Sequence, residues 1–206
     1  MNLFERISTK LIFQKIKQYQ TIEGWLSVKE AVNLYRFVSQ VKGPQPVIVE
    51  IGSWKGKSTY CLAKGFSKGK LITIDPFDGS GENGSVEIYQ LQKGGEPLID
   101  QFKNNMKRLG VLKQIEILEG RSQQFIGLFS KIDLLFIDGE HSVKACDSDF
   151  LGYAPALVSG AYLIFHDYQP SRKELGPTWV VENRVLPSNF FKFIGLFDSL
   201  WVGQKV

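Results

Sequence analysis

The sequence contains few of the residues that build disulfides or zinc sites. Its 206 residues include two cysteines and two histidines. Cys61 and Cys146 both fall in predicted helices among apolar neighbours, and their separation is not that of a metal or redox pair. We therefore expect two buried free thiols and a reducing compartment.

Long apolar runs and dense positive charge are also missing. No apolar run approaches the roughly 20 residues that cross a bilayer, and Met1–Arg6 has neither the basic start nor the apolar core of a signal peptide. The net charge is +4 and the basic residues are scattered, which argues against a nucleic-acid partner. We expect a soluble cytoplasmic protein with no membrane partner, folded as one domain over residues 1–206.

Two common nucleotide-binding motifs are absent from the stretch that organises the chain, residues 47–59. It reads VIVEIGSWKGKST: an apolar run, an acid, and two glycines four positions apart. Neither the G-x-G-x-x-G fingerprint nor a phosphate-binding loop has this spacing. Glu50 would repel a phosphate but suits a ligand with an ammonium or sulfonium charge. The stretch predicts a strand–turn–helix cradle for a nucleotide without phosphate.

Strand and helix patterns alternate after residue 47, which predicts an α/β fold with a mostly parallel, doubly wound sheet. The expected strands are 47–51, 70–75, 114–119, 132–138 and 158–166, and the expected helices are 56–67, 97–109, 122–130 and 143–155. Two more apolar runs, 190–196 and 200–203, are joined by three residues. This link is too short for a parallel crossover, so we expect an antiparallel hairpin at the sheet edge.

Residues 1–43 are predicted to be helical and to cover the sheet edge or the mouth of a site, with a homodimer contact as the alternative use. Ser27, followed three residues later by Glu30, predicts a capping box at the start of a second helix. The first helix has apolar residues at helical spacing: Leu3, Ile7, Leu11, Ile12, Ile16 and Tyr19.

An acid closes the second strand of the predicted sheet. Asp75 follows Gly52 by 23 residues, the distance expected of one strand–helix–strand step. A carboxylate at this place can accept both hydroxyls of a ribose. The alternative is that Asp75 is a turn residue before Pro76.

Four segments together resemble one known family. They are residues 49–59 (VEIGSWKGKST), 74–77 (IDPF), 133–141 (DLLFIDGEH) and 160–168 (GAYLIFHDY). In this order they resemble the class I S-adenosylmethionine-dependent methyltransferases. The nearest branch includes the macrolide and aminocoumarin sugar O-methyltransferases and is related to catechol O-methyltransferase. The resemblance covers residues 45–205 and implies a Rossmann-like, seven-stranded sheet whose last strand is antiparallel.

The resemblance also implies which residues contact the cofactor. Glu50, Gly52 and Ser53 match positions around the methionine part, and Asp75 matches the acid that binds the ribose. Adenine is usually held just after the third strand, at Gly120, Arg121 and Ser122. The complete cofactor set that we expect is Glu50, Gly52, Ser53, Lys57, Ser58, Asp75, Pro76, Gly120, Arg121, Ser122, Asp138, Gly139 and His141.

The two histidines stand beside acids at the ends of neighbouring strands. Parallel neighbours lie about 4.8 Å apart, so Asp138, His141, His166 and Asp167 should converge at the carboxyl edge of the sheet. We predict that these four residues are catalytic.

The same residues predict a divalent-metal site, since carboxylates and imidazoles can hold such an ion. In the related sugar and catechol enzymes, an acid at the end of the fourth strand and an acidic or amide pair at the end of the fifth bind magnesium, and Asp138 and Asp167 match that pattern. The ligand set that we predict is Asp138, His166 and Asp167. His166 departs from the pattern, because the relatives more often have an oxygen ligand there. The alternative is a metal-free cluster in which His141 or His166 is the base.

The glycine-rich segment 76–95 follows the predicted ribose acid and is our candidate lid. Phe77 and Tyr89 would line an apolar wall for the acceptor, with residues 176–179 as a second candidate wall. The resemblance implies transfer of a methyl group from S-adenosylmethionine to a small molecule, most simply to a hydroxyl. The alternatives are a non-catalytic S-adenosylmethionine-binding protein and a Rossmann-like enzyme of other chemistry.

Overall fold

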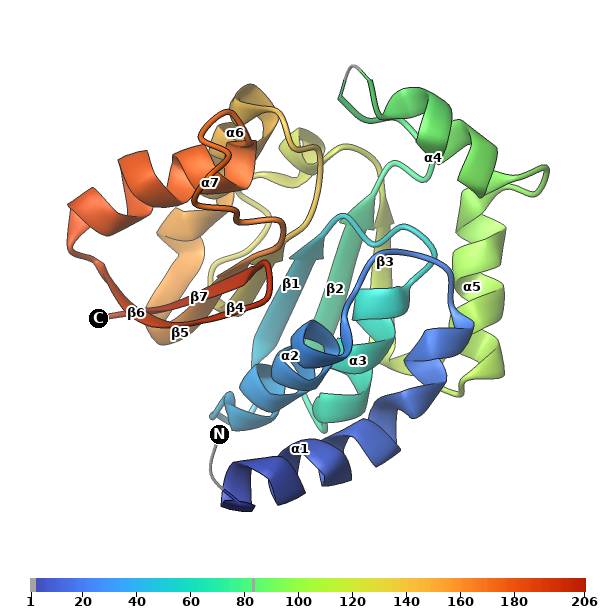
Figure 1. The fold of residues 1–206 in the computed structure, drawn as a ribbon, viewed down its shortest axis with the longest axis horizontal. Coiled ribbons are helices and arrows are strands. Elements are labelled where there is room, and N and C mark those ends of the chain that lie inside the picture. Colours follow the sequence, from blue (N-terminus) through green and yellow to red (C-terminus); the bar gives the residue numbers. More distant parts are fainter. Residues whose placement is uncertain (1–2, 83) are drawn as a thin grey trace.

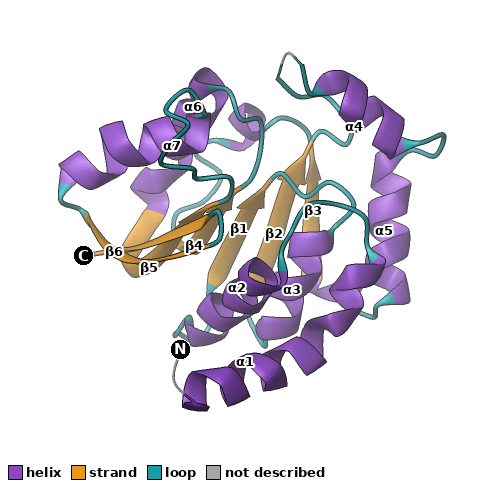
Figure 2. Ribbon diagram, viewed as in Figure 1, coloured by secondary structure: helices purple, strands orange, loops and turns teal. Residues whose placement is uncertain are grey.

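The computed structural model describes residues 3–82 and 84–206, and within them seven strands form a sheet in the order β3–β2–β1–β4–β5–β7–β6. Neighbours from β3 to β5 run parallel, whereas β7 is antiparallel to both β5 and β6. The predicted sheet with an antiparallel hairpin at its edge is confirmed (Figures 1 and 2). The strands are β1 (Val47–Ile51), β2 (Lys70–Asp75), β3 (Ile115–Glu119), β4 (Ile132–Ile137), β5 (Leu157–Phe165), β6 (Phe191–Phe197) and β7 (Leu200–Lys205).

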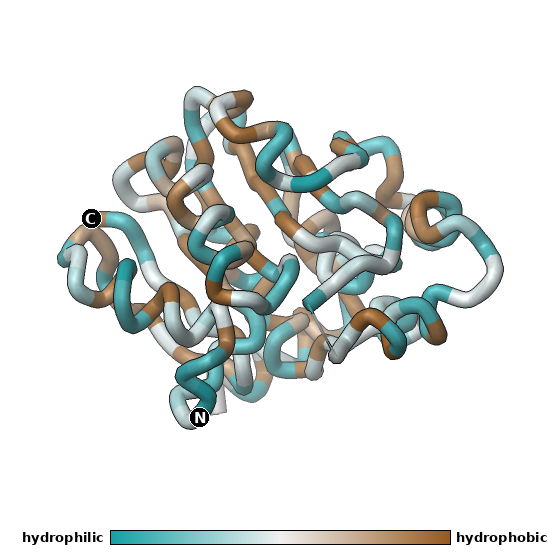
Figure 3. The backbone as a smooth tube through the Cα atoms, turned by 90° about the horizontal axis from the view of Figure 1, so that it is seen from above, coloured by the Kyte–Doolittle hydropathy of each residue, from teal (hydrophilic) through white to brown (hydrophobic). Residues whose placement is uncertain are grey.

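Both faces of the sheet are apolar because alternate residues of each buried strand point to opposite sides. In β1, Ile48 belongs to one buried cluster and Val49 to the other. Helices α1, α2, α3 and α5 pack residues into the first cluster, and α6 and α7 pack into the second. Hydrophilic and hydrophobic residues alternate along the chain in short stretches (Figure 3). The helices are α1 (Leu3–Ile16), α2 (Val28–Gln40), α3 (Lys57–Gly65), α4 (Val86–Lys93), α5 (Leu98–Arg108), α6 (Val143–Tyr153) and α7 (Gly176–Val180).

The predicted N-terminal helices are present, but part of the apolar face predicted for the first helix is exposed rather than buried. Ile16 and Tyr19 are buried, whereas Ile7 is 52% exposed and Leu11 is 60% exposed. The packing of α1 is therefore concentrated at its end, where a 3₁₀ turn (Lys17–Thr21) leads toward the sheet. Residues 1 and 2 of the predicted helical segment lie outside the described residues.

Two other expectations differ from the structure. Residues 122–130 were expected to be one helix, but only Ser122–Phe125 form a 3₁₀ turn. Residues 76–95 show little periodicity in the sequence, yet they contain α4, which has no buried residue. A helix without a buried face leaves no apolar stripe by which it could be predicted.

The capping box at the start of α2 is confirmed. Ser27 Oγ accepts a bond from the backbone of Glu30, and the Glu30 carboxylate accepts one from the backbone of Ser27. Cys61 and Cys146 are buried and free, as predicted. Over the residues that the structure describes, every helix is too short or too polar to cross a membrane.

Candidate active site

A cavity of about 500 Å³ lies at the carboxyl ends of the parallel strands. Thirteen of the predicted site residues line it. Glu50 and Gly120 do not line it: Glu50 lies in β1 before the glycine turn, and Gly120 directly precedes the lining residue Arg121. The lining residues predicted from the sequence are Gly52, Ser53, Lys57, Ser58, Asp75, Pro76, Arg121, Ser122, Asp138, Gly139, His141, His166 and Asp167.

The glycine turn after β1 packs directly against the end of β4. Gly52 has a φ of 85°, and a Cβ on it would lie 2.1 Å from the carbonyl oxygen of Asp138. Only glycine allows this conformation and this approach. Ser53 and Trp54 line the cavity, and Ser53 Oγ and Trp54 Nε1 are buried without a hydrogen-bond partner among the described residues. Unpaired buried polar atoms on a cavity wall fit a site that binds a polar ligand.

Asp75 holds the turn from the end of the neighbouring strand. Its Oδ2 accepts bonds from the backbone N–H groups of Ser53 (2.8 Å) and Trp54 (2.9 Å), and its Oδ1 accepts one from Phe77 (2.6 Å). Burial raises the pKa of Asp75, although these three bonds favour the carboxylate. Asp75 nevertheless lines the cavity.

Glu50 lies beneath the turn, and its side chain is fully buried. Its carboxyl accepts hydroxyl bonds from Ser58 (2.6 Å) and Thr59 (2.5 Å) of α3 and from Thr73 (2.9 Å) of β2. Burial raises the pKa of Glu50 to about 7 against the effect of these bonds. In this structure Glu50 links β1, β2 and the start of α3 rather than lining the cavity.

The end of β3 supplies the opposite wall. Arg121 and Ser122 line the cavity, and the Arg121 backbone donates to Gln124 Oε1 (2.7 Å) where Gly120 leaves room. Ser122 Oγ donates to the carboxyl of Asp149 on α6. Asp149 also lines the cavity, and burial raises its pKa to about 6. The sequence did not indicate Asp149, because nothing in its own helix distinguishes it from a surface acid.

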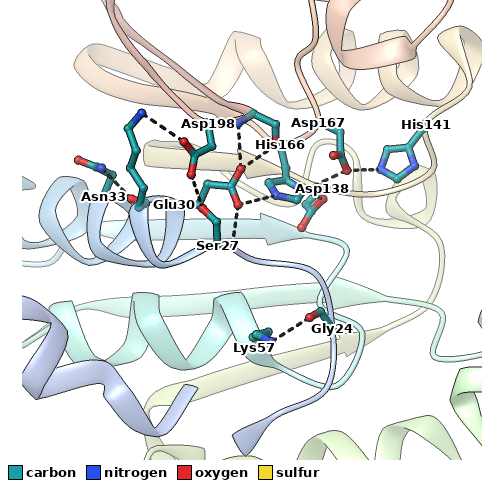
Figure 4. Close-up of polar contacts among 12 residues, drawn as sticks. Gly24, Ser27, Glu30, Asn33, Lys57, Asp138, His141, His166, Asp167 and Asp198 are labelled. Carbon is teal, nitrogen blue, oxygen red and sulfur yellow. Dashed lines mark hydrogen bonds and ion pairs between the residues drawn. The ribbon is translucent and has the colours of Figure 1, made fainter. Parts of the chain in front are cut away.

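The four predicted catalytic residues converge at the ends of β4 and β5. His166 Nδ1 lies 3.0 Å from Asp138 Oδ1 and 3.1 Å from Asp167 Oδ2. His141 Nε2 lies 3.1 Å from the same oxygen of Asp167 (Figure 4). Asp167 has a φ of 56°, a left-handed backbone conformation that is uncommon for residues other than glycine, asparagine and aspartate.

Three of these side chains are placed to hold one ion. The ligand atoms of Asp138, His141 and Asp167 all lie within 4.8 Å of one another. This group differs from the predicted set in one member, because His141 takes the place of His166. The His166 side chain is only 5% exposed, and its two nitrogens face carboxylates. Two carboxylates and an imidazole suit manganese, iron or zinc as well as magnesium.

The charges in the cluster stabilise one another. Burial would lower the pKa of His141, but bonds to Asp167 and Glu82 raise it to about 10. Burial also opposes the charge on His166, yet Asp138 and Asp167 raise its pKa well above the ordinary value. Burial raises the pKa of Asp138, while the two imidazoles hold that of Asp167 well below its usual range. The two imidazoles and the neighbouring carboxylates therefore favour each other's charged forms, against the effect of burial.

Two acids from distant segments complete this cluster, and neither was expected from the sequence. Glu82 accepts a bond from the His141 backbone (3.2 Å), and its other oxygen lies 3.3 Å from His141 Nδ1. Glu30 Oε2 lies 3.4 Å from His166 Nε2. Burial opposes the charge on Glu30, but His166 and the α2 cap lower its pKa to about 2. These pairings join residues far apart in the chain, which no local pattern reveals.

Aromatic side chains from three segments form one side of the cavity. Trp25, Trp54 and Tyr89 have ring centroids 5.6–6.0 Å apart and all line it. The prediction for Phe77 is wrong, because its ring packs on Phe102 (5.3 Å) in the buried core.

The second wall predicted for the acceptor, residues 176–179, does not line the cavity. Within residues 176–179, Gly176 packs against the backbone of residues 141 and 142, and it is Leu175, one residue earlier, that lines the cavity.

A family described as a methyltransferase domain matches residues 49–168, which is more than half of the chain. The matched residues run from the glycine turn to the end of the cluster on β5. The chain belongs to the class I S-adenosylmethionine-dependent methyltransferases. The resemblance recognised in the sequence motifs is thereby confirmed.

Other proteins are similar to this methyltransferase over most of the domain. An uncharacterized protein of Acanthamoeba polyphaga mimivirus is 27% identical over 124 residues, which are 60% of this chain. The match covers 52% of that protein, so the chain spans about half the length of this curated relative.

Two solved structures share the fold. The O-methyltransferase NovP aligns with a TM-score of 0.68 at 18% identity, over 87% of this chain and 81% of NovP. The O-methyltransferase TomG of Streptomyces achromogenes, solved in complex with S-adenosylmethionine, aligns with a TM-score of 0.64 at 14% identity. That alignment covers 97% of this chain and 89% of TomG. At these identities the likeness concerns the fold of the methyltransferase.

Proposed function

We propose that this methyltransferase transfers the methyl group of S-adenosylmethionine to a hydroxyl of a small molecule, assisted by a divalent ion. The observation that carries the proposal is the convergence of Asp138, His141 and Asp167 in the cavity that the glycine turn also lines. The proposed donor cradle and the Asp–His cluster thus share one cavity. The structures of NovP and TomG, both O-methyltransferases, support the same reaction class.

The cradle residues would hold the donor. Ser53 Oγ and the surrounding backbone would contact the methionine part, Asp75 would accept the ribose hydroxyls, and Ser122 would face the adenine. S-adenosylmethionine supplies an electrophilic methyl group, so the protein needs to align the acceptor, remove its proton and exclude water.

Asp138, His141 and Asp167 would hold the ion and face the acceptor hydroxyl. A divalent ion there would supply Lewis acidity that lowers the pKa of a hydroxyl. His166 Nδ1 lies 3.0 Å from Asp138 and 3.1 Å from Asp167, and would orient the two carboxylates.

A metal-free form of the same site is favoured by one specific contact. Glu82 lies 3.3 Å from His141 Nδ1, and Asp167 Oδ2 lies 3.1 Å from Nε2. An acid on one imidazole nitrogen fixes the ring so that the other nitrogen can accept a proton. In that form His141 is the general base after losing its own proton, and because Glu82 and Asp167 raise its pKa to about 10, the rate should increase with pH. Chelation of metal separates the two forms.

We also propose that residues 76–95 act as a lid. Glu82 reaches His141 across the cavity, and Tyr89 packs on Trp25 and Trp54. Glycines with positive φ flank these contacts, at Gly79 and Gly94. The segment can therefore close over the acceptor while its hinges absorb the backbone rotation.

The test is methyl transfer from labelled S-adenosylmethionine to a panel of sugars, catechols and other hydroxyl compounds. The protein is first treated with a chelator and then assayed with magnesium, manganese, iron or no added metal. We expect the rate to depend on metal, and Asp167→Asn to lower turnover by about 100-fold while leaving S-adenosylmethionine binding within about twofold.

Asp147→Asn is the matched control, because Asp147 pairs with Arg184 on the outside of α6 and should leave turnover unchanged. Binding of S-adenosylmethionine without transfer to any acceptor would contradict the proposal and favour a non-catalytic binding protein. Transfer that is unaffected by chelation would leave the metal-free form with His141 as base.

A further inference from the structure

Glu30 is a buried charged residue that the proposed reaction does not use. It lies in the first turn of α2, its side chain is 5% exposed, and it does not line the cavity. A buried carboxylate is costly unless several partners compensate it. The residues that contact the Glu30 carboxylate therefore indicate its role.

Both carboxylate oxygens of Glu30 are engaged by distant parts of the chain. Oε1 accepts bonds from the backbone N–H (3.0 Å) and the hydroxyl (2.7 Å) of Ser199, at the turn of the β6–β7 hairpin. Oε2 accepts the backbone N–H of Ser27 (2.8 Å) and faces His166 Nε2 at 3.4 Å. Figure 4 shows Glu30 between the start of α2 and the His166 ring.

The capping role alone does not require this charge. Glutamine serves the same position of a capping box as well as glutamate does. The carboxylate is instead matched to an imidazole whose opposite edge contacts the catalytic cluster: His166 Nδ1 is 3.0 Å from Asp138 and 3.1 Å from Asp167. The ring also lies edge-on to Phe136, with centroids 6.5 Å apart. One edge of His166 thus faces Glu30 at ion-pair distance, while the other edge contacts the two carboxylates of the site.

The fold gives Glu30 a fixed position from which to do this. The α2 cap anchors it on one side and the hairpin turn on the other. Asp198 in the same turn accepts bonds from Ser27 Oγ (2.7 Å) and Lys29 Nζ (3.2 Å), so α2 and the hairpin are joined twice. A side chain fixed at both ends can impose an orientation on a third group.

We propose that Glu30 is a positioning residue that fixes the His166 ring, so that Nδ1 points at Asp138 and Asp167. Its effect on turnover rests on the proposed methyl transfer, whereas its effect on the ring does not. Without Glu30, the ring can rotate and Nδ1 no longer holds the two carboxylates in the arrangement that binds the ion.

The test variant is Glu30→Gln, which keeps the cap but offers only one oxygen. Glu30→Asp is the second variant, because its shorter side chain keeps the charge and withdraws from His166. Ser199→Ala is the control, since it removes a bond to the other oxygen of Glu30 without touching His166. With two histidines in the chain, ring ¹⁵N signals and contacts between His166 and Phe136 protons can be assigned by NMR.

We expect one ring orientation in the native chain and in Ser199→Ala, and a second orientation in both Glu30 variants. In the methyl-transfer assay we expect kcat to fall by about tenfold or more in the Glu30 variants, with KM for S-adenosylmethionine within about twofold. Ser199→Ala should lower the melting temperature but leave kcat within about twofold.

An unchanged His166 orientation in the Glu30 variants would overturn the proposal. So would a changed orientation with unchanged kcat, because the ring would then not matter to the reaction. If the native chain transfers no methyl group, the proposed function fails on its own, and the NMR comparison still decides whether Glu30 fixes the ring.

Discussion

Replacing Asp75 by asparagine tests the donor cradle at the residue that both shapes it and faces the ligand. The carboxylate accepts three backbone bonds, two on Oδ2 and one on Oδ1. An asparagine has one oxygen and one NH₂ group. If its oxygen faces Ser53 and Trp54, its NH₂ group meets the N–H of Phe77, and that donor loses its partner.

The cost can be worked from these contacts. A bond to a charged group contributes about 1.5–3 kcal/mol, and a buried donor left without a partner costs about 1–3 kcal/mol. Burial already disfavours the charge on Asp75. Because asparagine is uncharged, its burial costs less, and this difference offsets part of the loss. We therefore expect a net loss of about 2 kcal/mol in unfolding free energy, or about 4–8 °C in melting temperature for a chain of this size.

The effect on the ligand is measured by calorimetric titration of S-adenosylmethionine. Loss of the charged acceptor for a ribose hydroxyl should raise the Kd by about tenfold or more. Asp133→Asn is the control: Asp133 also accepts a backbone bond, from Val47 (2.7 Å), but at the opposite end of the sheet. A Kd and a melting temperature for Asp75→Asn that match the control would refute the reasoning.

Two further substitutions test the residues around the turn. Gly52→Ala places a Cβ 2.1 Å from the Asp138 carbonyl at a φ of 85°, so it should cost more than about 3 kcal/mol of unfolding free energy. Gly110→Ala, with a φ of 74° and open space around it, should cost only about 1–2 kcal/mol, and similar losses in the two variants would contradict the steric argument. Glu50 has a pKa of about 7 in the fold against an ordinary 4.5, so native stability should fall as the pH rises from 4.5 through 7 and level off above. We expect this fall, about 3 kcal/mol, to vanish in Glu50→Gln when urea unfolding is followed from pH 5 to 8; equal pH dependence in both proteins would show that Glu50 is not the titrating group.

The sheet and the edge where the site forms could be predicted from the sequence because the relevant signals are local. Apolar runs with acids or glycines at their ends, such as those before Gly52 and Asp138, specify both a buried strand and its last residue. The convergence of the histidines on the acids followed from strand spacing alone.

The remaining parts depend on contacts between distant segments. Glu30 and His166 have no common local pattern, and they meet only because α2 packs beside the β6–β7 hairpin. The choice of His141 over His166 for the ion-holding group depends on side-chain direction, which strand spacing does not specify. Helix α4 buries no residue, so the sequence carries no apolar periodicity from which this helix could be predicted.

The strand order also has a consequence in time. Strand β7 follows the other six strands of the sheet in the sequence, yet it lies between β5 and β6. While the chain is being synthesised, β5 therefore keeps an open hydrogen-bonding edge until residues 200–205 have emerged. The strands that carry the donor cradle precede β5 in the sequence or pair with it directly. The hairpin that anchors Glu30 closes only when β7 pairs with β5 and β6. The residues of the cofactor cradle thus precede in the sequence the hairpin strand that completes the contacts of Glu30.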